Sequence, residues 1–91
     1  MKYELVFTAR FRKDLKTIDK RGYNMAYLDE VLQTLCNGKA LPSKNRDHAL
    51  SGRWAGFREC HVTPDWLLIY RIEDDVLALV LTRTGTHSDL L

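Results

Sequence analysis

Five side chains in the second half of this sequence could together form a site for acid–base chemistry on a phosphate. They are His61, Asp65, Trp66, Arg83 and His87. Imidazoles give and take protons near neutral pH, and a guanidinium matches phosphate oxygens with paired donors. Attack of an RNA 2′-hydroxyl on its adjacent phosphate needs a base, an acid for the leaving 5′-oxygen and a cation for the charge at phosphorus. These residue types therefore indicate a phosphodiester site that needs no metal, if the fold brings them together.

The segments that carry these groups are predicted to be three consecutive strands, at about residues 56–62, 66–73 and 76–84, joined by short turns. Short turns connect antiparallel neighbours, so the end of the first strand, the start of the second and the end of the third share one edge of the sheet. With a simple register, His61 and Asp65 lie nearly opposite each other, with β-carbons about 5 Å apart. The pattern therefore predicts that the groups gather at this edge.

The first half of the chain is predicted to supply a strand and a helical hairpin. Residues 2–8, KYELVFT, alternate as a strand does. Two apolar stripes at helical spacing follow and are expected in the core: Phe7, Phe11, Leu15 and Ile18, in a helix over 9–20, then Met25, Leu28, Leu32 and Leu35, in a helix that stops at Asn37–Gly38. Residues 39–53 are polar and contain Pro42 and Gly52, so we expect a long surface connection, of a length that is uncommon unless functional.

Together these elements predict an α+β fold in a single domain, residues 1–91. An N-terminal strand and a helical hairpin precede an antiparallel three-stranded meander, with the helices packed on one face of the sheet. The stretch WLLIY, residues 66–70, is apolar on both sides, as a central strand should be. The active groups are then expected at one edge of the other face.

The composition, 45% hydrophobic and 29% charged, is that of an ordinary globular protein. No apolar stretch approaches the roughly 20 residues of a membrane span, and the N-terminus lacks the apolar core of a signal peptide. We therefore expect a cytoplasmic protein without a membrane partner. Cys36 and Cys60 match no paired-cysteine motif, which favours two ordinary thiols over a disulfide or a metal site.

Positive charge is concentrated in two regions, although the net charge is only +2. Residues 10–21 carry six basic groups against two acids, and residues 39–58 carry five against one. Such clusters are usually solvated surface, but two of them in a short chain favour a phosphate-bearing partner. The expected contacts are Arg10, Arg12, Lys13, Lys16, Lys20, Arg21, Lys44, Arg46 and Arg53.

Each candidate site residue also has a purely structural interpretation. A lone histidine is more often a surface or hydrogen-bonded residue, and Asp65 after Pro64 suits a type I turn. Trp66 could anchor the core, and Arg83 could be an ordinary charge at a strand end. Zinc is disfavoured because no two histidines have the spacing that preorganises a metal site. The predicted convergence of several such groups at one sheet edge favours a catalytic site over these structural interpretations.

Two stretches closely resemble the YafQ branch of the RelE/ParE superfamily of bacterial toxins: DHALSGRWAGFRECHVTPDWLLIYRI and LTRTGTHSDLL. The resemblance covers the second half of the chain in its motifs and the whole chain in the order of elements. It implies the toxin of a type II toxin–antitoxin system, an endoribonuclease (mRNA interferase) that cuts mRNA in the ribosomal A site. The implied partners are the ribosome, mRNA and a DinJ/RelB-like antitoxin, in a heterotetramer built on a DNA-binding antitoxin dimer. No cofactor is implied.

Carried over residue by residue, the resemblance places the catalytic groups on five residues of this chain: His48, His61, Asp65, Arg83 and His87. It implies that His87 is the general acid, that Arg83 is the transition-state cation, and that Asp65 or His61 is the base. His48 enters through the resemblance alone, because the strand pattern does not place the long connection. Trp66 is expected to support the site.

The last residue departs from the family pattern. The pattern usually closes with an aromatic side chain, and this chain has Leu91 there. Stacking on a base is therefore replaced by apolar contact that could shape a pocket.

The main alternative is a non-catalytic inhibitor of DNA gyrase, as in the ParE branch, on the same scaffold. A gyrase poison has no need for histidines and an arginine gathered at one sheet edge, so the histidine set favours the nuclease. A degenerate toxin, kept only as a partner for its antitoxin, is disfavoured by the intact motif.

Overall fold

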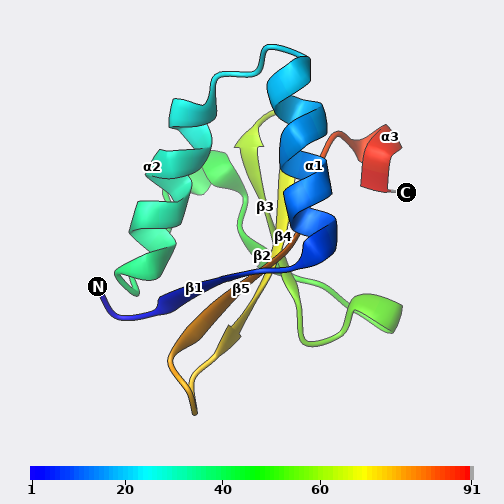
Figure 1. The fold of residues 1–91 in the computed structure, drawn as a ribbon. Coiled ribbons are helices and arrows are strands. Elements are labelled where there is room, and N and C mark those ends of the chain that lie inside the picture. Colours follow the sequence, from blue (N-terminus) through cyan, green and yellow to red (C-terminus); the bar gives the residue numbers. More distant parts are fainter. Residues whose placement is uncertain (91) are drawn as a thin grey trace.

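The computed structural model describes residues 1–90 and has a five-stranded mixed sheet in the order β1-β5-β4-β3-β2 (Figure 1). The strands are β1 (Glu4–Phe7), β2 (His48–Ala49), β3 (Arg58–Thr63), β4 (Trp66–Glu73) and β5 (Ala78–Gly85). β1 runs parallel to β5, and the other neighbours are antiparallel. The predicted α+β class and the antiparallel meander are confirmed.

Two helices, α1 (Ala9–Lys20) and α2 (Met25–Cys36), form the predicted hairpin on one side of the sheet (Figure 1). Each begins at a side chain that caps its first turn: Thr8 accepts a hydrogen bond from the Phe11 amide, and Asn24 accepts one from the Ala26 amide. Three short helices complete the described chain: the 3₁₀ turns η1 (Ser43–Asn45) and η2 (Gly52–Trp54), and the C-terminal α3 (His87–Leu90).

The core lies between the helices and the sheet. Its largest fully buried members come from both layers and include Phe11, Ile18, Trp66, Leu68, Tyr70, Leu79 and Leu81. The expected burial of Phe7 is wrong, because its side chain is 40% exposed. Phe7 ends β1 at the edge of the sheet, where its ring stacks on Phe11 with centroids 5.8 Å apart. Cys36 and Cys60 are free and buried, as expected of ordinary thiols.

Two of the predicted boundaries were wrong for local reasons. β5 begins at Ala78 because residues 74–77 form the turn, in which the Leu77 amide bonds the Asp74 carbonyl and Leu77 takes a left-handed φ of 48°. The connection over 39–53 is more ordered than predicted. It contains η1, η2 and β2, which pairs with β3 and extends the sheet. Among residues 1–90, no helix has the length and apolar character needed to cross a membrane.

The outer edge of β5 forms hydrogen bonds with two different elements along its length. The second of these is α1 with its capping residue, and the bonds fix the position of that helix. β1 pairs only with residues 78–81 of β5. Beyond that point α1 supplies the partners: the Thr8 hydroxyl donates to the Thr82 carbonyl at 3.0 Å, and Asp14 accepts from the Thr84 amide at 3.1 Å. The start of α1 therefore takes the place of a strand beside the end of β5.

Candidate active site

The sheet register places three of the predicted groups on the face that the helices do not cover. His48 pairs with Glu59, Glu59 with Ile69, and Ile69 with Arg83, so these residues form one row across four strands. Ile69 lies between Leu68 and Tyr70, which belong to the helix-side core. Because side chains alternate along a strand, the row projects from the opposite face. His61 lies on the same face, two residues beyond Glu59.

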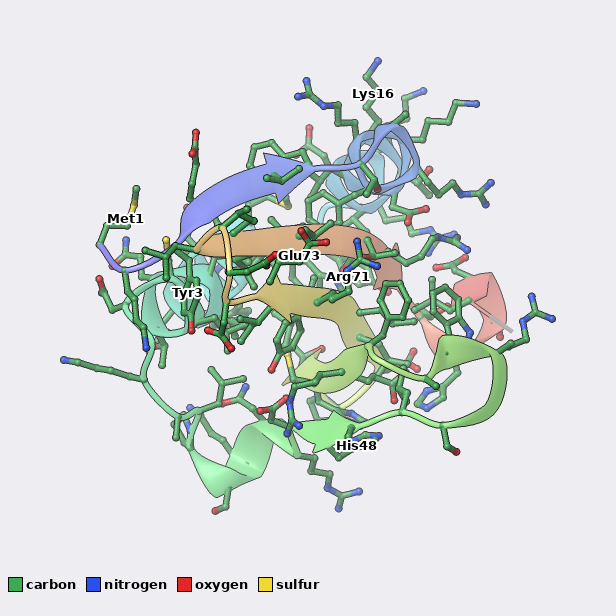
Figure 2. All side chains as sticks on the ribbon, turned by 90° about the horizontal axis from the view of Figure 1, so that it is seen from below. Met1, Tyr3, Lys16, His48, Arg71 and Glu73 are labelled. Carbon is green, nitrogen blue, oxygen red and sulfur yellow. The ribbon has the colours of Figure 1, made fainter. Side chains whose placement is uncertain are left out.

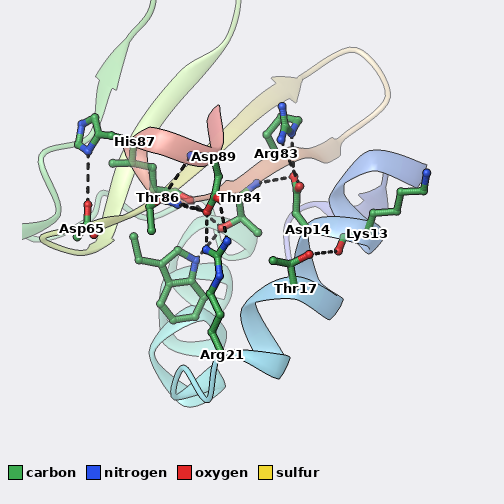
Figure 3. Close-up of polar contacts among 12 residues, drawn as sticks. Lys13, Asp14, Thr17, Arg21, Asp65, Arg83, Thr84, Thr86, His87 and Asp89 are labelled. Carbon is green, nitrogen blue, oxygen red and sulfur yellow. Dashed lines mark hydrogen bonds and ion pairs between the residues drawn. The ribbon is translucent and has the colours of Figure 1, made fainter. Parts of the chain in front are cut away.

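His61, Asp65 and His87 come together, although they derive from three different segments. The rings of His61 and His87 have centroids 6.0 Å apart and are tilted by 55°. Nδ1 of His87 lies 3.8 Å from Oδ1 of Asp65 (Figure 3). The side chains of His87 and Asp65 are 53% and 75% exposed, so a substrate can reach them. Two imidazoles at this separation can serve as the acid and the base for one phosphodiester.

The expectation that His61 and Asp65 lie opposite each other was wrong. The register shifts between His61 and Thr63, so His61 pairs with Leu67, while Thr63 pairs with Trp66. The turn is therefore Pro64–Asp65, and Asp65 sits at its tip. A bulge moves one residue out of the pairing and redirects its neighbours, which no local pattern had revealed. Asp65 reaches the site by facing His87 and not His61.

The turn carbonyl of Pro64 favours one tautomer of the neutral His61 ring. Its Nδ1 lies 3.2 Å from the carbonyl oxygen of Pro64. A carbonyl only accepts hydrogen bonds, so the neutral ring carries its proton on Nδ1 and leaves a lone pair on Nε2. A histidine held in this tautomer is equipped to accept a proton.

His48 stands at the far end of the row from Arg83, about 14 Å away if neighbouring strands are spaced by about 4.8 Å. Its Nδ1 lies 2.7 Å from the Arg46 carbonyl, and its Nε2 lies 3.5 Å from Oε1 of Glu59. Sequence reasoning missed Glu59. The alternation of β3 could have found it, because residues 59 and 61 share a face of that strand.

Arg83 is held by α1 and does not contact the histidines (Figure 3). Its Nε donates to Oδ2 of Asp14 at 2.8 Å, and its Nη2 donates to Oδ1 at 3.3 Å. The two side chains are only 17% and 10% exposed. This side-on pairing uses one edge of the guanidinium and leaves Nη1 without a hydrogen-bond partner among those found in residues 1–90. Asp14 is one of the two acids in the basic region 10–21, and its sequence position alone predicts no such contact.

Trp66 lies beneath the site and is 1% exposed. Its indole Nε1 donates to the Thr84 hydroxyl at 2.8 Å, and that hydroxyl donates to the Leu67 carbonyl at 2.7 Å. The ring packs edge-on against Tyr23, with centroids 5.3 Å apart. The indole thus joins β4 to β5 and to the helical layer, in agreement with a supporting role.

His87 begins α3, immediately after β5. Asp89 of the same turn pairs with Arg21, whose guanidinium, together with the Thr86 amide, holds the pKa of that carboxyl well below its usual range. Leu91 lies outside the described residues, so its predicted apolar contact stays a prediction.

Most of the expected phosphate-binding residues fall into two groups, and Arg53 lies apart from both, in η2. Lys44 and Arg46 line a pocket of about 300 Å³ together with His61 and Pro64. The other group lies on α1, where Lys16 points outward from the helix (Figure 2). Two of these charges are paired with a carboxylate, that of Arg21 with Asp89 and that of Arg10 with Asp14.

The comparisons with known proteins agree with this geometry. A family model described as "Bacterial toxin of type II toxin-antitoxin system, YafQ" matches residues 3–91. The chain belongs to this family. The mRNA interferase toxin YafQ of Escherichia coli K12 is 39% identical over 88 residues, which cover 96% of this chain and 94% of the relative.

Two solved structures are similar to this chain over nearly its whole length. The E. coli DinJ–YafQ complex contains a chain of 38% identity and TM-score 0.89, with 98% of each chain covered. A copper-bound mutant toxin from Helicobacter pylori is also 38% identical, with a TM-score of 0.92 and coverage of 98% of this chain and 99% of that one. Within residues 1–90, no group of three or more His, Cys, Asp or Glu side chains is arranged to hold a metal ion.

The predicted resemblance to YafQ toxins is thereby confirmed, and the chain is the toxin of a type II toxin–antitoxin system. The predicted enzyme class, an endoribonuclease, is confirmed at the level of the YafQ family by the name of the E. coli relative. The roles of the individual residues remain predictions.

Proposed function

We propose that this YafQ-family toxin is a ribosome-dependent endoribonuclease that cleaves mRNA in the A site. The observation that carries the proposal is the facing pair of imidazoles, His61 and His87, with centroids 6.0 Å apart and Asp65 beside His87. A base and an acid on either side of one phosphate are what cleavage through the 2′-hydroxyl requires. We also infer that the family falls within the RelE/ParE superfamily and that the toxin acts in the cytoplasm.

His61 is the better placed of the two candidate bases. Its Nδ1 hydrogen is committed to the Pro64 carbonyl, so Nε2 takes the proton of the 2′-hydroxyl. The 2′-oxygen then forms a bond to phosphorus as the bond from phosphorus to the 5′-oxygen breaks. His87 gives its proton to that leaving oxygen, which produces a 2′,3′-cyclic phosphate and a 5′-hydroxyl end.

Asp65 acts through His87 in this scheme. Its carboxylate lies 3.8 Å from Nδ1 of His87, where it orients the ring and leaves Nε2 to deliver the proton. Arg83 supplies positive charge for the oxygens on phosphorus, and Asp14 fixes the edge of the guanidinium that faces α1. We assign His48 to substrate binding or proton transfer at the far end of the row, where Glu59 orients its ring.

One assay tests this function directly. Purified toxin is incubated with one transcript, either naked, with non-translating ribosomes, or in a translating system, and primer extension maps the ends. We expect new 5′-hydroxyl ends only during translation. Equal cleavage of naked RNA would overturn ribosome dependence. Absence of cleavage together with inhibition of gyrase supercoiling would favour the ParE-like alternative.

Ribosome binding is expected to be electrostatic and to depend on the two basic groups. Each phosphate contact makes log affinity fall with log salt by about 0.7 to 0.9. Lys16→Gln should therefore reduce the salt slope by about that amount. Lys2→Gln removes the same charge outside both groups and serves as the control. Binding that does not vary with salt would show that the basic clusters are only solvated surface.

The partner expected for a toxin of this family is a protein antitoxin. We propose a DinJ/RelB-like antitoxin whose acidic or apolar segment covers the basic site, within a heterotetramer. The solved DinJ–YafQ complex of E. coli supports this proposal. Co-expression with the neighbouring small gene of the native host should yield a complex without cleavage activity, and an active toxin in the presence of that product would contradict it.

A further inference from the structure

Asp89 is the centre of a hydrogen-bonded cluster that joins the C-terminal helix α3 to the end of α1 (Figure 3). Nη1 and Nη2 of Arg21 donate to its two carboxylate oxygens at 2.6 and 2.9 Å. The amide and the hydroxyl of Thr86 donate to Oδ2 at 2.9 and 3.0 Å. Arg21 is the residue at which α1 ends, so the cluster ties α3 to α1 across 68 positions of sequence.

Asp89 and Thr86 also cap the start of α3. The Asp89 amide donates to the Thr86 hydroxyl oxygen at 3.3 Å, while the Asp89 carboxylate accepts from the Thr86 amide. This reciprocal pattern is a capping box, with His87 as the first helical residue. A helix of four residues has no stability of its own in water, so its orientation depends on such contacts.

Gly85 provides the space that the Asp89 side chain occupies. Its φ is +155°, and a Cβ added there would lie 2.9 Å from Cβ and from Oδ2 of Asp89. Only glycine allows the carboxylate to pack this closely against the end of β5. Gly85, Thr86 and Asp89 thus form one unit around His87.

The imidazole of His87 has weak attachments of its own. Its ring lies 3.8 Å from Asp65, beyond hydrogen-bond length, and its side chain is 53% exposed. What fixes its place opposite His61 is therefore the backbone of α3. That backbone is attached to the rest of the fold by the end of β5 and by the pair between Asp89 and Arg21.

We propose that Arg21 and Asp89 are positioning residues, which hold α3 so that His87 faces His61 and Asp65. The inference rests on the proposed role of His87 as the general acid. It gives Arg21 a different function from the RNA contact that its charge suggested. Because catalysis depends on placement to within about an ångström, loss of this pair should slow cleavage without weakening binding.

The Asp89 carboxylate is ionised at neutral pH, so its pair with Arg21 is intact there. The pKa of the Asp89 carboxyl is far below its ordinary value of 3.8, mainly because of the Arg21 hydrogen bonds. A carboxyl whose pKa is lower in the folded state than in the unfolded state stabilises the fold at every pH above its unfolded-state pKa. This stabilisation is lost as the pH falls from there through the folded-state pKa. The contribution is therefore complete above about pH 5 and declines only in more acidic solution.

The test compares Arg21→Gln and Asp89→Asn with Arg71→Gln. Arg71 also pairs with a carboxylate at 2.6 Å, that of Glu73, but lies outside the proposed site. In a translating system at saturating ribosome concentration, we expect single-turnover cleavage about tenfold slower in the two site variants and unchanged in the control. The ribosome concentration for half-saturation and its salt slope should stay the same in all three.

A second measurement on the isolated toxin separates positioning from other roles. Contacts between the His61 and His87 rings, detected by NMR, should be lost in Arg21→Gln and Asp89→Asn and kept in Arg71→Gln, with amide spectra showing that each variant is folded. Arg21→Lys keeps the positive charge but not the paired donors of the guanidinium, so its cleavage rate should lie between those of the wild type and Arg21→Gln. This variant replaces Asp89→Asn in the comparison if Asp89→Asn does not fold.

Three outcomes decide whether Arg21 and Asp89 position His87. Full cleavage rates in both site variants would overturn the proposal. Weaker ribosome binding with a smaller salt slope in Arg21→Gln, at an unchanged saturated rate, would overturn it in favour of an RNA contact. If the wild-type toxin does not cleave, the proposed function fails, while loss of the ring contact in the two variants would still support the positioning of His87 by this pair.

Discussion

His87→Gln is expected to abolish mRNA cleavage and growth inhibition, with a loss of about a hundred- to ten-thousandfold in rate. Glutamine keeps much of the size of histidine and a hydrogen-bonding end, but it does not deliver a proton at neutral pH. The substitution therefore separates acid catalysis from packing. Single-turnover cleavage in a translating system is the measurement.

The fold should tolerate this change. The His87 side chain is 53% exposed, and glutamine is a good helix former, so we expect a stability loss below about 1 kcal/mol. Binding of antitoxin and ribosome should be nearly unchanged. Ser88→Ala, at the next and exposed residue of α3, is the control and should keep full activity. If His87→Gln retained more than about a tenth of the wild-type rate, the acid would have to be His48 or His61.

Asp14→Ala is expected to lower the free energy of unfolding by about 2 to 4 kcal/mol, the largest stability effect that we predict for a polar side chain. The carboxylate accepts hydrogen bonds from Arg83 and from the Thr84 amide, at 2.8 and 3.1 Å. Its removal leaves the 17% exposed guanidinium and the buried amide without this acceptor. Urea denaturation measures the change.

Two further variants define the cause of that loss. Asp14→Asn keeps an oxygen that can accept from the Thr84 amide but removes the charge that faces Arg83, so it should cost about half as much as the alanine variant. Asp19→Ala removes an exposed carboxylate from the same helix and should change stability by less than about 0.5 kcal/mol. A loss below about 1 kcal/mol in Asp14→Ala would show that water replaces the carboxylate at little cost.

Both Asp14 variants should also slow cleavage, because Arg83 loses the contact that fixes its guanidinium. The effect should appear in the saturated rate more than in ribosome binding if Arg83 acts on the transition state. Equal loss in both parameters would indicate that Arg83 contributes to binding of the RNA as a whole.

The elements that depend on neighbouring residues were predictable from the sequence. The helix over 9–20 was predicted with the observed bounds, because its apolar spacing is a local signal. The antiparallel order of β3, β4 and β5 followed from their short turns, and with it the approach of His61 to His87. The family motif added His48, which alternation alone had not placed.

Contacts between distant segments were not predictable in this way. Arg83 and Asp14 are 69 positions apart, and Arg21 and Asp89 are 68 apart. Each pair exists because α1 runs beside the free end of β5, and no periodicity within either segment records that crossing. The register shift after His61, which turns Asp65 toward His87, is likewise invisible in the pattern of residue types.

The sequence by itself therefore determined the helices, the strand order and the set of groups available for acid–base chemistry, since periodicity, caps and turns act over a few residues. Only the tertiary structure decided how those groups are held: His61 by the Pro64 carbonyl, Arg83 by Asp14 and His87 by a helix tied to Arg21. The physical reason is that a hydrogen bond depends on position and direction in space, which arise when the helices and the sheet pack together.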